Sequence, residues 1–83
     1  MASLETTNLT TAWLAWDRWC RNKAKRPRGN EGRAESARLV SELVHIADQL
    51  GTSHAKLRDA ITTEIGSGTS IPDAIERVVQ ATM

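Results

Sequence analysis

The chain of 83 residues has no phenylalanine or tyrosine, one cysteine and two histidines, and no long apolar run. The lone thiol of Cys20 cannot form an internal disulfide, which excludes a disulfide-stapled fold. One cysteine with His45 and His54 falls short of the four ligands of a structural zinc site, so we expect no metal. The sequence also shows no secretory signal and no apolar stretch of the ~20 residues that cross a bilayer. We therefore expect a cytoplasmic protein with no membrane partner.

Residue patterns typical of enzymes are missing as well. No acid and base stand at useful spacing beside a nucleophile, and no glycine-rich phosphate loop follows a strand. Cys20 lies among tryptophans, where a thiol is more often a small core residue than a nucleophile. We expect neither catalysis nor a cofactor.

The composition favours helix. Alanine, leucine, arginine and glutamate are plentiful, and the β-branched residues recur at helical spacing rather than in alternation. A chain of this length buries only about 60% of its unfolded surface, so it supports one small core, and we expect a homodimer to add buried area. The sequence predicts a single all-α domain that follows a disordered segment 1–7 and contains a basic loop at 26–33. Its four helices are expected at 8–25, 31–50, 53–65 and 70–82.

Several helix ends have recognisable signals. Asn8 is expected to cap the first helix, and Pro27 to end it beyond Lys25. The run Gly66-Ser67-Gly68 is a C-terminal stop for the third helix. For the fourth helix, Ser70 followed by Asp73 resembles a capping box, and Pro72 falls in the first turn, where its missing N–H is not needed.

The helix expected at 31–50 has an unusually broad apolar face. That width predicts contact with helices on two sides or with a second copy of the chain. The residues of this face are Leu39, Val40, Leu43, Val44, Ile46, Ala47 and Leu50.

The stretch from Leu43 to Ile61 combines a small residue, Ala47, with a glycine four positions later, Gly51. Two helices that cross steeply need a small residue at their contact and a corner residue that tolerates positive φ. Ile46, Leu50, Leu57 and Ile61 would form the inward wedge. This spacing resembles the helix-turn-helix of bacterial and phage repressors, whose second helix enters the major groove of DNA. Thr52 departs from the pattern, since valine or isoleucine is more usual after the glycine, and so does the small Ala60.

The alternative for this stretch is a plain helical bundle in which Gly51 ends one amphipathic helix and Thr52 or Ser53 caps the next. The resemblance covers about a quarter of the chain. The helix at 31–50 is also longer than the first helix of a typical helix-turn-helix, and its excess length favours a bundle.

The resemblance implies a set of DNA-reading residues at the start of the helix at 53–65. Arg58 would donate to guanine, Ser53 and His54 to bases or phosphates, and Ala55 would contact a thymine methyl. Asp59 would be repelled by phosphates unless it pairs with Arg58 or with a cytosine amine. The alternative is a solvated face of mixed charge. The full candidate set is Ser53, His54, Ala55, Lys56, Arg58 and Thr62.

Positive charge is concentrated in one segment. Seven basic residues and one acidic residue fall between Arg18 and Arg33, so this stretch carries +6 and the remainder sums to −5, within a net charge of +1. Such a patch suits a polyanion, an acidic protein surface or simply a solvated linker. The residues that would neutralise phosphates are Arg21, Lys23, Lys25, Arg26 and Arg28.

All the aromatic residues lie close together. Trp13, Trp16 and Trp19 fall within seven residues on one stripe of the first helix. Each buries about 150–250 Å² when packed, so they are expected to form the core contact of this helix or a dimer seam. The alternative is an exposed patch that docks on another protein, with Trp19 the most accessible.

These observations lead to two hypotheses. The first is a DNA-binding regulator that binds double-stranded DNA as a homodimer, with a bacterial, phage or plasmid origin suggested by analogy alone. The second is a non-enzymatic module, such as a phage inhibitor of a host polymerase or CRISPR effector, that docks through its Trp and Arg face. Buried tryptophans with an exposed helix at 53–65 would favour the first, and exposed tryptophans the second.

Overall fold

The computed structural model describes residues 5–21 and 31–83, with only the backbone described for 31 and 32. Within these ranges the chain is helical and contains no strand, which confirms the predicted all-α fold of four helices. Part of the predicted basic loop and the end of the first helix near Lys25 lie outside the described residues. The helices are α1 (Thr7–Arg21), α2 (Glu31–Leu50), α3 (His54–Gly66) and α4 (Ile71–Thr82).

The start of α1 differs from the prediction. Asn8 lies inside the first turn rather than at its cap, because the Thr10 N–H already donates to the Thr6 carbonyl at 2.9 Å. The Glu5 carboxylate accepts the Thr7 N–H at 2.8 Å. Hydrogen bonds from the Thr7 side chain and backbone lower the pKa of Glu5. Of residues 5–7, expected to precede the helix as a disordered segment, Thr7 is the first residue of α1, and Glu5 and Thr6 accept hydrogen bonds from its first turn.

A tight turn joins α2 to α3. Gly51 adopts φ of +74°, and the Thr52 N–H reaches back to the Ala47 carbonyl at 3.0 Å, while the Gly51 N–H approaches the Asp48 carbonyl at 3.3 Å. This pattern is a Schellman motif, which satisfies the last carbonyls of a helix and needs a left-handed residue after it. The corner predicted at Gly51 is present.

The two ends of α3 are also well defined. The Ser53 hydroxyl accepts the Lys56 N–H at 3.2 Å, so Ser53 is the N-cap. At the other end, Gly68 has φ of +100° and the Thr69 N–H donates to the Glu64 carbonyl at 3.2 Å, which repeats the Schellman geometry. The predicted stop after α3 is confirmed.

The cap of α4 is simpler than predicted. Ser70 is the N-cap residue and Pro72 lies in the first turn, as expected. The Ser70 side chain makes no capping hydrogen bond, so the capping box proposed with Asp73 is not formed. The Ser70 carbonyl accepts the Ala74 N–H at 2.8 Å and begins the helical ladder.

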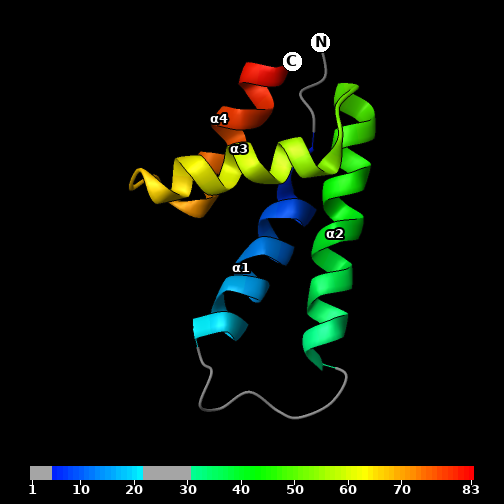
Figure 1. Cartoon of the computed structure of the whole chain (residues 1–83), viewed down its shortest axis with the longest axis vertical. Coiled ribbons are helices and arrows are strands. Elements are labelled where there is room, and N and C mark those ends of the chain that lie inside the picture. The colour runs from blue at the N-terminus through cyan, green and yellow to red at the C-terminus, as the bar shows by residue number, and fades with distance from the viewer. Residues whose placement is uncertain (1–4, 22–30) are drawn as a thin grey trace.

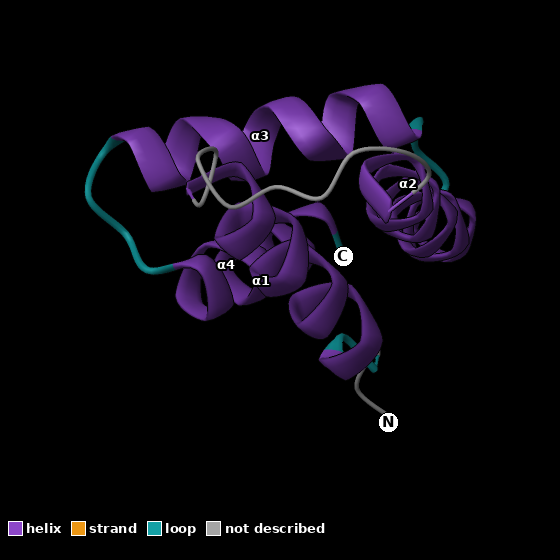
Figure 2. Cartoon of the chain, turned by 90° about the horizontal axis from the view of Figure 1, so that it is seen from below, coloured by secondary structure: helices purple, strands orange, loops and turns teal. Residues whose placement is uncertain are grey.

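The helices are arranged in two layers. Figure 1 shows α1 and α2 running antiparallel, with α3 crossing both at a steep angle near one end of the pair. Figure 2 shows α3 as a separate layer over α1 and α4, with α2 at one side. The closest packing is between α1 and α2, α2 and α3, α3 and α4, and α1 and α4. None of the described helices is both long and apolar enough to cross a membrane.

One core joins all four helices. Among the described residues, α2 and α4 each contribute four buried residues to it. α2 contacts α1 on one side and α3 on another, as its broad apolar face predicted. One edge of that face remains open, because Val44 is 36% exposed. The buried residues are Leu9, Ala12, Trp13, Leu39, Leu43, Ile46, Ala47, Leu57, Ile61, Ala74, Ile75, Val78 and Val79.

The left-handed conformation of Gly51 gives a testable prediction. A Cβ at this position meets no atom within 4 Å, so Gly51→Ala introduces backbone strain without a clash. We expect the free energy of unfolding to fall by about 1–2 kcal/mol, measured by urea denaturation followed by circular dichroism. Gly66→Ala is the matched control, since Gly66 is helical and equally open. It should raise the free energy of unfolding by up to about 1 kcal/mol, and equal losses in both variants would contradict the assignment.

Candidate functional site

The α2–α3 corner has the wedge that the sequence predicted. Ile46, Leu57 and Ile61 are buried, and Leu50 is partly buried against them. Ala47 is also buried, and its small side chain leaves room for the steep crossing of α3 over α2. The length of α2 has a separate cause, because the part of α2 remote from the corner lies alongside α1 (Figure 1).

The side chains of the first turn of α3 and of its N-cap lie on the surface of the molecule. Ser53, His54, Ala55 and Lys56 are all exposed, as a groove-reading segment requires. The first turn contains no acidic residue. Its free backbone N–H groups and the partial positive charge of the helix N-terminus therefore add to the charge of Lys56.

An acidic residue interrupts the exposed face of α3 one turn later. Asp59 is exposed and forms no ion pair within the described part of the chain, so it does not pair with Arg58. Its carboxylate stays available to repel phosphates. Glu64, near the end of α3, forms an ion pair with Arg77 of α4, in which the Glu64 Oε2 lies 3.9 Å from the Arg77 Nη1.

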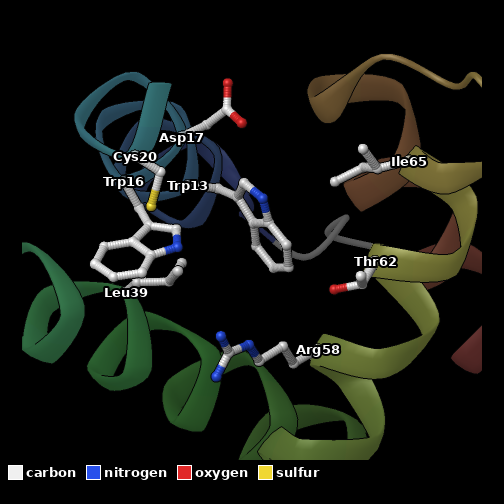
Figure 3. A pocket seen from close by; sticks show the side chains of 8 residues that line it. All are labelled: Trp13, Trp16, Asp17, Cys20, Leu39, Arg58, Thr62 and Ile65. Carbon is white, nitrogen blue, oxygen red and sulfur yellow. The ribbon is translucent and has the colours of Figure 1, made fainter. Parts of the chain in front are cut away.

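Arg58 and Thr62 come later in α3 than its exposed first turn. Both are exposed, but they line a cavity of about 240 Å³ between α3 and the α1–α2 pair. Figure 3 shows the Arg58 side chain extending from α3 across this space toward α2. Arg58 thus lies on the flank of α3 that faces the cavity, with no hydrogen bond or ion pair among the described residues.

The remaining walls of the cavity come from α1, α2 and the end of α3. Its apolar surface is formed by two indole rings and two aliphatic side chains, and Asp17 and Cys20 line the α1 side (Figure 3). The Asp17 carboxylate accepts a hydrogen bond from the Arg21 Nε at 2.8 Å. The lining residues are Trp13, Trp16, Asp17, Cys20, Leu39, Arg58, Thr62 and Ile65.

The tryptophans have separate roles. Trp13 is 7% exposed and belongs to the core. Trp16 and Trp19 are half-buried, and their rings stack with centroids 5.3 Å apart and an interplanar angle of 22°. Stacking covers part of each indole face, so Trp19 is less accessible than the docking hypothesis expects. Most of the indole surface is used within the chain.

Of the five basic residues predicted to contact phosphate, the structure describes Arg21. Arg21 is exposed at the end of α1 and is paired with Asp17. In Figure 1 this end of α1 lies away from the α2–α3 corner. The other residues predicted to contact phosphate, Lys23, Lys25, Arg26 and Arg28, lie outside the described residues.

Sequence reasoning missed the cavity. Its charged lining residues, Asp17 and Arg58, are more than forty positions apart, and each is typical of a solvated helix face. Only the packing of α3 across the α1–α2 pair brings them to one space. The one local feature that could have indicated a polar site there is Asp17, a carboxylate at the margin of the tryptophan stripe.

The chain was compared with models of protein families, with curated proteins and with solved structures, and none of the three comparisons found a match. Its own residues are therefore the basis for inferring its function.

Proposed function

We propose that the protein binds double-stranded DNA through α3, with α2 and α3 acting as a helix-turn-helix-like pair. The observation that carries this proposal is the tight corner at Gly51, which holds α3 across the bundle with its first turn exposed. A helix presented in this way fits the major groove. His54 and Lys56 supply hydrogen-bond donors and Ala55 an apolar contact, a mixture suited to base edges and phosphates.

The electrostatics of α3 support a contact with DNA at its N-terminal end. The charge of Lys56 and the amide groups of the first turn attract phosphate, whereas Asp59 opposes it. The first turn would therefore approach the DNA backbone and groove more closely than the middle of the helix. Arg58 can reach DNA only from the flank that borders the cavity.

The rest of the proposal concerns affinity and assembly. The segment that contains Arg21, Lys23, Lys25, Arg26 and Arg28 would supply salt-sensitive, sequence-independent affinity. A homodimer would present two copies of α3 to an operator-like site, and binding there would regulate transcription. Light scattering on the same sample gives the oligomeric state.

The test is fluorescence anisotropy of a labelled random duplex, titrated at low and at physiological salt. We expect a Kd on the order of 1–100 μM that rises steeply with salt. The double variant Lys56→Gln, Arg58→Gln should reduce the salt dependence by about two phosphate contacts. Asp59→Asn should tighten binding by about threefold because it removes a repulsive carboxylate.

The matched control for Asp59→Asn is Glu76→Gln, which makes the same change in charge on α4, in the layer beneath α3. It should change the affinity much less than Asp59→Asn. Equal effects of the two neutralisations would show that net charge alone is sensed and that α3 does not contact DNA. Absence of binding at low salt would overturn the proposal and leave the half-buried Trp16–Trp19 stack as the surface to test against proteins.

A further inference from the structure

The cavity between α3 and the α1–α2 pair has the chemistry of a ligand site. We propose that it binds a small aromatic carboxylate of one or two fused rings. The rings would lie against Trp13 and Trp16, and the carboxylate would pair with the Arg58 guanidinium. This site is separate from the exposed first turn of α3.

The size of the cavity limits the ligand. Its volume of about 240 Å³ exceeds the ~150 Å³ of an engineered cavity that holds benzene. It is smaller than the ~300–1,000 Å³ of pockets that take drug-sized molecules. One aromatic ring fits with room to spare, and a second fused ring fills the remainder.

The walls select a planar apolar body. Trp13 and Trp16 present indole surface from α1, and Leu39 and Ile65 add aliphatic surface from α2 and α3. Aromatic rings pack against indoles in stacked or edge-to-face geometry, with a gain beyond the area they bury. A flexible aliphatic chain would gain only the burial.

The charges select an anion. Asp17 is already paired with Arg21 at 2.8 Å, so its charge is compensated. Arg58, in contrast, has no ion pair or hydrogen bond within the described part of the chain, although its side chain extends over the cavity. A guanidinium binds a carboxylate in a bidentate, charge-assisted manner. The Thr62 hydroxyl, on the same wall, offers one more donor.

The position of Arg58 links this site to α3. A carboxylate held by Arg58 would neutralise a cation on the proposed DNA-binding helix and so weaken its affinity for phosphate. This coupling rests on the proposed function, whereas ligand binding itself does not. Bound aromatic carboxylate would thus act as a negative effector of DNA binding.

The test uses 2-naphthoate as the probe and follows the three indole Nε1–H resonances of the ¹⁵N-labelled protein by NMR. We expect saturable shifts of the Trp13 and Trp16 signals at millimolar probe. 2-Naphthalenemethanol, which lacks the charge, should bind about tenfold more weakly than 2-naphthoate. Arg58→Gln should remove this preference for the carboxylate, and Lys56→Gln, the matched control on the same helix, should retain it.

Unshifted Trp13 and Trp16 resonances would overturn the site, and equal affinity for acid and alcohol would overturn the role of Arg58. Adding saturating 2-naphthoate to the duplex titration then tests the coupling, with a severalfold weaker DNA affinity expected. Binding of 2-naphthoate without any DNA binding would keep the cavity site and reject the proposed function. DNA binding without any shift of the indole resonances would keep the proposed function and reject the cavity site.

Discussion

Leu43→Ala is expected to lower the free energy of unfolding by about 2–5 kcal/mol, a large part of the net stability of so short a chain. Leu43 has no exposed surface and lies on α2, the helix that contacts both α1 and α3. Truncation removes apolar contacts and leaves a cavity that the surrounding helices can only partly fill. A domain of this length has roughly 5–10 kcal/mol of net stability, so the variant should be close to unfolding at room temperature.

Urea denaturation followed by tryptophan fluorescence measures this loss. Trp13 belongs to the same core, so its emission should shift to the red as the core opens. Leu14→Ala makes the same truncation on the outer side of α1, where Leu14 is 38% exposed, and should cost less than about 1 kcal/mol. Similar midpoints for the two variants would contradict the core described above.

Ala47→Leu is expected to destabilise the chain by about 1–3 kcal/mol and to displace α3. Ala47 is 1% exposed at the α2–α3 corner, and its carbonyl also accepts the Thr52 N–H that closes the turn. Three additional carbon atoms have no space there unless the two helices separate. Because α3 carries the proposed DNA-binding surface, any DNA affinity should fall by more than the stability loss explains.

The control for this variant is Ala37→Leu, which adds the same atoms to an exposed position of α2. It should change the free energy of unfolding by less than about 0.5 kcal/mol and leave the DNA affinity unchanged. The displacement itself can be followed by hydrogen exchange of the Thr52 amide, which should lose protection in Ala47→Leu alone. An undisturbed Thr52 amide in a stable Ala47→Leu variant would show that the corner has unfilled space.

The corner between α2 and α3 was predictable because its determinants are local. Gly51, which tolerates positive φ, and Ser53, a good N-cap, stand within three residues between two apolar patterns of helical period. The bounds of α2, α3 and α4 accordingly agree with prediction to about one residue. Local patterns were less informative where the prediction depended on a hydrogen bond between two particular residues. The Ser70–Asp73 capping box depended on a side-chain hydrogen bond that Ser70 does not make.

The position of Arg58 was beyond local reasoning. The sequence spacing places Arg58 on the same helix as His54 and Lys56. It does not show that the side of α3 carrying Arg58 faces the indoles of α1. That relation depends on how far α3 lies over the α1–α2 pair, which is set by long-range packing of side chains such as Ile61 and Ile75. The residues proposed to read DNA are exposed, as predicted. That Arg58 and Thr62 also line the cavity could be recognised only from the structure.

The pairing of helices along the chain also has a consequence for the kinetics of folding. Three of the four closest helix pairs are successive in sequence, and only α1 with α4 joins the two ends. Contacts between neighbouring elements close short loops, which is the topology of proteins that fold within microseconds to milliseconds. The α1–α4 contact closes the longest loop, so its formation costs the most conformational entropy. Loss of this one contact would let α1 and α4 fray together while the α2–α3 corner stays folded.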